Sequence, residues 1–283
     1  MSINSPRNLS LIVVIKLKIA VIGGTGLEAL MTNVKVKSFT TPFGYVEAAV
    51  GYIDGEEILF IPRHGFKHEY PPHKVKYKGN IFLCKKLGVE WIIATSAVGS
   101  LREDIPPGTI VIPTDLIDYT KNREYTFFND ITVHIDFTRP YCEKLGEIIY
   151  LEAKRLGLNV VHGGTYVCFE GPRFETPSEI KMFKLLGADI VGMTNVPESI
   201  LARELSMHYS LIALVTNYAA GIQHRVSQDE VYEIMEKFRK NILDLVLNVV
   251  NKVKAIDIFK DYCLENEENA RKFVERWESA NTY

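Results

Sequence analysis

Short runs of apolar residues recur along this chain, and segments with helical periodicity separate them. Each run is too short for a helix, and glycine or small polar residues end most of them, which is typical of buried strands. The runs are Lys18–Ile22, Trp91–Ala94, Ile110–Ile112, Tyr166–Phe169, Ile190–Met193 and Leu211–Thr216. Strands that alternate with helices predict a single-domain α/β fold, with one central sheet and helices on both of its faces.

A hairpin signal predicts that this sheet is mixed rather than purely parallel. Val46–Ile53 and Glu57–Ile61 flank Asp54-Gly55, a dipeptide that favours the tight turn between antiparallel strands. Val34–Phe39 also has the pattern of a strand. We therefore expect antiparallel strands beside a parallel core.

Two capping boxes mark the starts of helices. Thr176–Glu179 carries proline at the first helical position, and Gly187 ends that helix. Ser227–Glu230 opens a long helix in which apolar residues from Val231 to Val253 recur every three or four positions. That spacing predicts one continuous buried helix face.

Composition limits the classes of partner. A length of 283 residues with 47% hydrophobic and 24% charged residues is typical of a globular protein with a substantial core. The formal net charge of −2 offers no attraction to nucleic acid or to an acidic membrane. The four cysteines form no C-x-x-C pair, so we expect neither a disulfide scaffold nor a cysteine-based zinc site, and a cytoplasmic location.

The two ends of the chain differ from its centre. The apolar run Leu9–Ile15 is shorter than the roughly 20 residues of a membrane span and lacks the features of a signal peptide. The last residues are rich in charge, and we expect Phe273 and Trp277 there to pack on the body or on a neighbouring subunit. The predicted division is an N-terminal extension over residues 1–17, one domain over 18–256 and a charged C-terminal helix or arm over 257–283.

Groups that suit phosphate follow several of the predicted strands. They are Thr25 in a glycine-rich turn, Arg63 and His64 in a Pro-Arg-His-Gly segment, Ser96 in a run of small residues, and Thr194. The carboxyl ends of strands in an open α/β sheet form one binding edge. Hydroxyls, backbone N–H groups and a planar guanidinium all suit phosphate oxygens. The sequence therefore predicts a phosphate site at this edge.

Other interpretations of these motifs stay open. Gly24–Ala29 matches a dinucleotide fingerprint, but Thr32-Asn33 interrupts the helix which that fingerprint needs. The same segment is also compatible with a plain tight turn. Glu198 has the position of an ordinary carboxylate at a helix start, and the spacing of His68 and His73 fits no common metal site.

Six motifs in a fixed order carry a resemblance to a known family. They are GGTG, PRHG, SAVGSL, EGPRFET, GMTNVPE and VTNYA, which lie between Lys18 and Lys254. The chain resembles the trimeric purine nucleoside phosphorylase and methylthioadenosine phosphorylase family. The resemblance implies a purine nucleoside and orthophosphate as substrates, no metal or organic cofactor, and a homotrimer or a hexamer of two trimers.

The resemblance also implies roles for single residues. The residues expected around phosphate are Thr25, Arg63, His64, Ser96, Ala97 and Thr194. Met193 is expected under the ribose and Phe174 on the purine. His134 resembles a histidine that reaches the 5′ end of the sugar from the adjacent subunit.

Three residues distinguish the two branches of that family. Methylthioadenosine phosphorylases carry an Asp-x-Asp pair where this chain has Asn217 and Ala219, and they lack the equivalent of Glu175. A carboxylate accepts N1–H of a 6-oxopurine but opposes the N1 lone pair of adenine, and an asparagine amide donates to O6. The residues therefore predict phosphorolysis of inosine and guanosine in purine salvage, with Asn217 stabilising the departing purine.

Three alternative functions remain. The Arg63–Ile81 segment is most similar to the methylthioadenosine branch, so phosphorolysis of methylthioadenosine or methylthioinosine is the nearest alternative. A hydrolytic nucleosidase is disfavoured by Arg63 and the hydroxyl residues. A non-catalytic nucleotide-binding protein is disfavoured because each phosphate and base position is retained.

Overall fold

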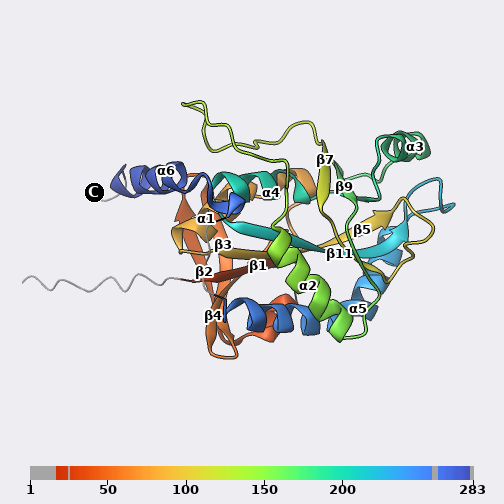
Figure 1. The fold of residues 1–283 in the computed structure, drawn as a ribbon, viewed down its shortest axis with the longest axis horizontal. Helices are drawn as coiled ribbons and strands as arrows, with labels where there is room; N and C mark the ends of the chain where they lie inside the picture. Colours follow the sequence, from red (N-terminus) through yellow and green to blue (C-terminus); the bar gives the residue numbers. More distant parts are fainter. Residues whose placement is uncertain (1–16, 25, 257–260, 281–283) are drawn as a thin grey trace, which may run out of the picture.

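The computed structural model describes residues 17–24, 26–256 and 261–280 (Figure 1). Within these residues one mixed sheet of 11 strands forms the centre of the molecule, and helices cover both of its faces. The single-domain α/β fold expected from the sequence is confirmed.

The predicted hairpin forms one end of the sheet. β3 (Gly44–Ile53) pairs antiparallel with β4 (Glu56–Pro62), and β2 (Thr32–Thr41) pairs with the outer side of β3. Asp54 and Gly55 between the hairpin strands both have positive φ, 46° and 83°, as the tight turn requires. This hairpin confirms the antiparallel part of the sheet.

The strand β5 (Trp91–Ser100) is the centre of the sheet. β1 (Ile19–Gly23) runs parallel to its first half, and β10 (Ile190–Gly192) pairs antiparallel with its last residues. β11 (His208–Tyr218) runs parallel to β5 on the other side. β4 follows on the far side of β1. Since β1 ends before β5 does, the second half of β5 has an open side.

The remaining strands extend the sheet in two directions from this centre. They are β9 (Thr165–Phe169) and β7 (Asp115–Tyr119) beyond β10, and β6 (Ile110–Ile112) and β8 (Val160–His162) beyond β11. β7 and β8 were not expected from the sequence, because β7 contains two aspartates and β8 is only three residues long and not fully buried.

Helices pack on both faces of the sheet, as Figure 1 shows. On one face lie α1 (Tyr77–Lys86), α4 (Asn195–Glu204) and α6 (Glu267–Ala280), and on the other lie α2 (Glu143–Arg155) and α5 (Gln228–Val253). Alternate residues of β11 supply the two cores: Leu211 faces the first group of helices and Ile212 the second. This alternation is the two-residue period of a strand covered on both sides.

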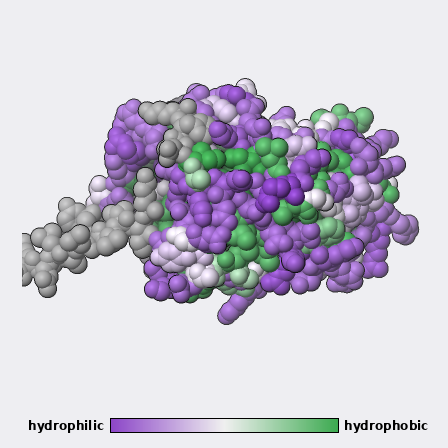
Figure 2. All heavy atoms as spheres, turned by 60° about the horizontal axis from the view of Figure 1, so that its bottom comes forward, coloured by the Kyte–Doolittle hydropathy of each residue, from purple (hydrophilic) through white to green (hydrophobic). Residues whose placement is uncertain are grey.

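The surface of the α5 side is mostly hydrophilic, with apolar residues in separate patches (Figure 2). α5 buries Leu245 and Val249 completely, whereas Glu233 and Lys240 on the same helix are exposed. The predicted apolar face of this helix is therefore confirmed over its second half.

The central strand is longer than the sequence indicated. Trp91–Ala94 was expected to end before the run of small residues, but β5 continues through Ser100. β11 pairs with it along the whole length, so the backbone of the small residues is satisfied by a strand ladder. Ser96 and Ala97 are half-buried within this strand, at its open side.

One predicted capping box is complete and the other is half formed. Thr176 and Glu179 exchange both hydrogen bonds at the start of α3 (Pro177–Leu185). At the start of α5, Ser227 accepts from the Glu230 N–H, but the Glu230 carboxylate instead accepts from Gln223, 2.8 Å away. A competing tertiary partner therefore replaces half of the local motif.

The C-terminal helix α6 packs on the body of its own chain. Phe82 of α1 makes edge contacts with Phe273 and Trp277, with ring centroids 6.1 and 5.3 Å apart. At the other end, Leu17 is buried and its N–H donates to the Leu87 carbonyl. The run Leu9–Ile15 lies outside the described residues. Within the part of the chain that is described, no helix has the length and apolarity to span a membrane.

Candidate active site

A cleft of about 630 Å³ opens beside the second half of β5. Its walls come from the ends of β1, β4, β10 and β11, from the loop before α3, and from the first turns of α5. The predicted residues that line it are Arg63, His64, Ser96, Ala97, Phe174, Glu175, Met193, Thr194 and Asn217. The fold thus brings segments from the whole length of the chain to one edge of the sheet, as expected for an open α/β fold.

The glycine turn after β1 forms one lip of this cleft. Gly26 has φ of 104°, and a Cβ at this position would lie 2.8 Å from Nη2 of Arg239. Only the four-residue η1 (Leu27–Leu30) follows, which is too short for the helix that a pyrophosphate site needs. The dinucleotide interpretation is therefore excluded. Thr25 lies outside the described residues, so its expected role stays a prediction.

Arg63 is buried and bonded to a buried carboxylate. Its Nε and Nη2 donate to the two oxygens of Glu198, both at 2.7 Å, and the two side chains are 3% and 0% exposed. Nη1 donates to the Thr95 carbonyl at 2.7 Å, and Nη2 also lies 3.4 Å from the Ile22 carbonyl. Of the five guanidinium donors, one on Nη1 is left for a ligand. Arg63 can therefore offer a ligand one N–H rather than its whole planar fork.

Glu198 belongs to a buried network that the sequence did not reveal. Tyr209 donates to the Glu198 carboxylate at 2.8 Å, Asn195 donates to the Tyr209 hydroxyl, and Tyr141 donates to Asn195. Burial alone would lower the pKa of Arg63, but the Glu198 charge outweighs it and raises this pKa. The position of Glu198 at a helix start was its only local signal.

Two hydroxyls meet where β5 passes the start of α4. Ser96 Oγ and Thr194 Oγ1 are 3.3 Å apart, and Ala97 is half-buried beside them. Thr194 is the N-cap residue of α4, but its side chain makes no capping hydrogen bond. Its hydroxyl lines the cleft beside that of Ser96, whereas regular helical geometry in α4 begins only after Val196, whose φ of −108° and ψ of 131° are not helical.

His64 is held as a neutral ring. Its Nδ1 lies 2.7 Å from the Tyr70 carbonyl, and the ring stacks on His68 with centroids 4.9 Å apart. Burial lowers the pKa of His64 to about 4. Since Nδ1–H donates to the carbonyl, Nε2 is an acceptor at neutral pH. Nε2 therefore offers a lone pair to the cleft, and the expected role of His64 at phosphate stays a prediction.

Glu175 is a nearly buried carboxylate that lines the cleft from the loop before α3. It follows Phe174, which also lines the cleft, and among the described residues no side chain forms an ion pair with it. Burial raises the pKa of Glu175 to about 7. The side chain is therefore close to half ionised at neutral pH, and its protonation state depends on the ligand that it faces.

A bulge in β11 orients Asn217 toward the cleft. The pairing with β5 shifts register between Val215 and Asn217, a distortion that re-aims side chains near binding sites. Asn217 Nδ2 donates to the Tyr218 carbonyl at 2.9 Å, and its Oδ1 accepts from Thr216 at 2.9 Å. One amide N–H and one lone pair are thus left for a ligand.

The other predicted residues have distinct surroundings. Met193 lines the cleft beneath Gly171, where a Cβ would lie 2.6 Å from the Met193 sulfur. Ala219 is packed in the apolar cluster around Phe183 and does not line the cleft. His134 is exposed, and the single chain does not bring it to the cleft.

The first half of α5 contributes a wall that the sequence did not predict. The residues of this wall are Gln228, Val231, Tyr232, Met235, Glu236 and Arg239. The sequence indicated only a packing face for this helix. The two halves of α5 differ in burial, since Tyr232 in the first half is 50% exposed.

Comparisons with known proteins agree with this architecture. The family model described as Phosphorylase superfamily matches residues 18–251. A probable 6-oxopurine nucleoside phosphorylase of Moorella thermoacetica is 50% identical over 240 residues, 83% of this chain and 92% of that protein. A probable S-methyl-5′-thioinosine phosphorylase of Methanothermobacter thermautotrophicus is 45% identical over 242 residues, 84% of this chain and 85% of that protein.

A solved structure has the same fold. Methylthioadenosine phosphorylase from Schistosoma mansoni in complex with tubercidin is similar with a TM-score of 0.82 and 32% identity, over 93% of this chain and 99% of that chain. The fold and cleft are those of a nucleoside phosphorylase. The chain belongs to the phosphorylase superfamily, which confirms the resemblance carried by the six motifs.

The Arg63–Glu198 pair yields a prediction about stability. Glu198→Gln leaves the Arg63 charge buried and uncompensated, which we expect to lower the free energy of unfolding by about 3–5 kcal/mol. Glu143→Gln is the matched control, because Glu143 pairs with Arg139 at 3.2 Å on the surface and such pairs contribute less than about 1 kcal/mol. Urea denaturation measures both, and equal losses in the two variants contradict the central role of the buried pair.

Proposed function

We propose that this enzyme catalyses the phosphorolysis of 6-oxopurine nucleosides, such as inosine and guanosine, to the free base and ribose 1-phosphate. The observation that carries the proposal is the presence of Glu175 and Asn217 in one cleft with the Ser96–Thr194 hydroxyl pair. The first two suit the edge of a 6-oxopurine, and the hydroxyls suit phosphate. We further propose a role in purine salvage in the cytoplasm.

Base recognition follows from the donors and acceptors left free in the cleft. The ionised Glu175 carboxylate accepts N1–H, and the remaining Asn217 amide N–H donates to O6. Adenine presents a lone pair at N1 and a donor at N6, so both contacts are lost. Each buried polar group left unpaired costs about 1–3 kcal/mol. Ala219 supplies no second carboxylate to accept from N6.

The proposed reaction is a displacement at the anomeric carbon by phosphate. As the bond to N9 lengthens, positive charge develops on the sugar and negative charge on the purine. Asn217 stabilises the purine charge by donating its one remaining amide N–H to O6, and this contact accelerates the reaction because it strengthens in the transition state. Phosphate is itself the nucleophile and no redox step occurs, so the reaction as proposed needs no protein nucleophile and no organic cofactor.

The phosphate is proposed to bind between the glycine turn and the hydroxyl pair. Its ligands are Thr25, the hydroxyls of Ser96 and Thr194, the backbone beside Ala97, the free Nη1 donor of Arg63, and His64. Neutral His64 suits a phosphate oxygen that carries a proton, because its Nε2 is an acceptor. Phe174 is proposed to pack on the purine and Met193 under the ribose, so that the bound substrates are held for in-line attack.

A second candidate function is phosphorolysis of a nucleoside with the same base but a different 5′ substituent on the sugar. The Methanothermobacter relative is named for methylthioinosine, which also carries a 6-oxopurine. The apolar side chains Val231 and Met235 in the α5 wall suit a methylthio group better than a hydroxyl. The 5′ substituent is therefore a separate variable in the assay below.

The first prediction concerns the second substrate. Release of hypoxanthine from inosine is expected to require orthophosphate and to yield one ribose 1-phosphate per base. The assay is a panel of inosine, guanosine, adenosine, methylthioinosine and methylthioadenosine, each with and without phosphate. Equal base release in phosphate-free buffer identifies a hydrolase instead. Preference for adenosine and methylthioadenosine contradicts the proposed base specificity.

The second prediction uses the titration of Glu175. Its carboxylate accepts N1–H only when ionised, and with a pKa of about 7 it becomes a donor in acid, which suits adenine N1. The ratio of kcat/KM for inosine to that for adenosine should fall about 100-fold from about pH 8 to about pH 6, because the ionised and protonated fractions of Glu175 change in opposite directions. Both reactions use phosphate, so the effect of its titration is the same for both and cancels in the ratio.

The control for this pH profile is Glu175→Gln. Its amide cannot titrate, so the ratio should be flat over the same range while the fold is retained. If the ratio depends on pH in the variant as it does in the wild type, a group other than Glu175 distinguishes the two purines.

The third prediction concerns assembly. We propose that the active site is completed by His134 of an adjacent subunit in a homotrimer or a hexamer of two trimers, because His134 is exposed and does not line the cleft of its own chain. Light scattering should give one of these two masses, and His134→Ala should raise the KM for nucleoside without changing the mass. A fully active monomer contradicts this prediction.

A further inference from the structure

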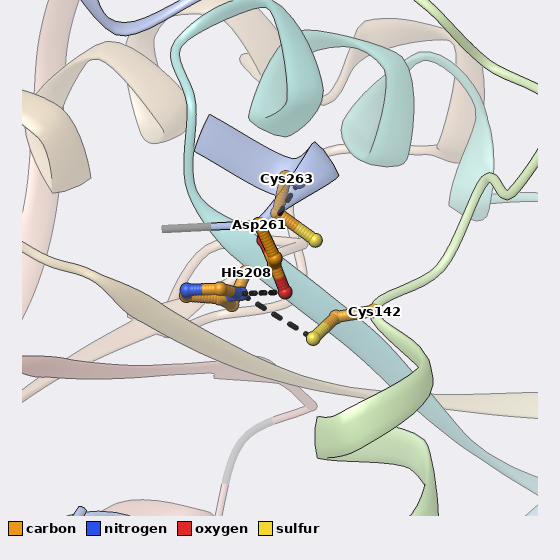
Figure 3. Close-up of side chains that lie close together, drawn as sticks. All are labelled: Cys142, His208, Asp261 and Cys263. Carbon is orange, nitrogen blue, oxygen red and sulfur yellow. Dashed lines mark hydrogen bonds and ion pairs between the residues drawn. The ribbon is translucent and has the colours of Figure 1, made fainter. Parts of the chain in front are cut away.

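Four potential metal ligands meet outside the cleft, on the α2 side of β11 (Figure 3). They are Cys142, His208, Asp261 and Cys263. Cys142 is the N-cap residue of α2, His208 begins β11, and Asp261 and Cys263 belong to the turn at η3 (Tyr262–Leu264). Because these segments are far apart in the chain, no local spacing revealed them.

The atoms that would bind a metal point toward one another, as Figure 3 shows. His208 Nδ1 lies 3.3 Å from Cys142 Sγ and 3.8 Å from Asp261 Oδ2, and all four ligand atoms lie within 4.8 Å of one another. Tetrahedral zinc with bonds of about 2.0–2.3 Å separates its ligand atoms by about 3.3–3.8 Å. The separations of 3.3 and 3.8 Å already fall in this range, and bringing the four ligand atoms from within 4.8 Å to tetrahedral spacing needs a shift of at most about 1 Å.

We propose that Cys142, His208, Asp261 and Cys263 bind one Zn²⁺ ion as a closed structural site. Two thiolates, one imidazole and one carboxylate are a ligand set that zinc takes in tetrahedral geometry. Binding transfers the two thiol protons to solvent and releases the water molecules of the hydrated ion. The expectation from the sequence that the chain has no cysteine-based zinc site is thereby revised.

The ligands are positioned by contacts behind them. Asp261 Oδ1 accepts the Cys263 N–H at 2.8 Å, which leaves Oδ2 directed at His208. The His208 ring stacks on Trp91, with centroids 4.2 Å apart and planes 19° apart. Cys142 Sγ accepts the Leu145 N–H at 3.5 Å at the N-terminus of α2, where a thiolate is favoured. Such outer contacts orient the ligands of metal sites.

Burial and charge also favour an ion here. Cys142, His208 and Cys263 are at most 1% exposed, and Asp261 is 18% exposed. Zinc with two thiolates and one carboxylate has a net charge of −1. The buried guanidinium of Arg203, which donates to the carbonyls of Tyr262 and two other residues, lies against η3 and balances that charge.

The site would fasten the C-terminal segment to the body of the protein. η3 precedes α6, which packs on the opposite face of the sheet from α2. A bound ion would therefore join the start of α2, the start of β11 and the segment that leads to α6. Its expected effect is on stability, because none of the four ligands lines the cleft.

The first test is metal content. The full chain is purified without a metal-binding tag under reducing conditions, equilibrated with ZnCl₂, and dialysed against metal-free buffer. Mass spectrometry should find about one zinc per chain in the wild type and in Cys84→Ser, a buried free cysteine of α1 outside the cluster. Cys142→Ser and Asp261→Asn should lose it. Zinc retained equally by all four proteins, or by none, overturns the proposal.

The second test uses the wild-type protein, so that misfolding of a variant cannot decide the outcome. Co²⁺ added to the apoprotein should give thiolate-to-cobalt charge-transfer absorption and the intense visible bands of a tetrahedral site. A chelator should lower the melting temperature of the wild type and of Cys84→Ser, but not that of Asp261→Asn. Absence of the thiolate band, or a Cys142–Cys263 disulfide in the protein as purified without reductant together with no bound metal, overturns the proposal. These readouts do not depend on phosphorolysis, so they stand or fall separately from the proposed function.

Discussion

The buried ion pair between Arg63 and Glu198 connects the elements that form the cleft. Arg63 follows β4, Glu198 lies in α4, and the same guanidinium bonds to carbonyls of β5 and β1. A guanidinium with this many fixed partners cannot move without leaving a buried charge unpaired. The pair therefore fixes the positions of three parallel strands and one helix relative to one another. The cleft-lining side chains at the ends of these elements are fixed with them.

This arrangement leaves the cleft with little net positive charge. Arg63 is neutralised by Glu198, and His64 is kept uncharged by burial. The proposed partners of a bound phosphate are therefore mainly hydroxyls and backbone N–H groups of the cleft, with the one Nη1 donor left on Arg63. Glu175 at the other end has a pKa near neutrality, so the charge state of the cleft responds to the bound base.

Much of the fold could be predicted from local patterns. Apolar runs located most of the central strands, Asp54-Gly55 located the hairpin, and the Thr176 capping box located α3, because each pattern reflects contacts within a few residues. The end of β5 was placed too early. Small residues such as Ser96 and Ala97 do not look like a strand until β11 is seen to pair with them.

The sequence by itself determined the α/β class, the family and nine of the residues that line the cleft. These residues lie in motifs at the ends of strands, and in an open α/β sheet the strand ends meet at one edge. Only the tertiary structure decided that Glu198 occupies the guanidinium of Arg63, and that Cys142 and Cys263 lie together. These partners come from distant segments, and no spacing along the chain records a contact that exists only after the sheet has formed. The physical reason is that local patterns encode the elements, whereas packing over long range selects the partners of each side chain.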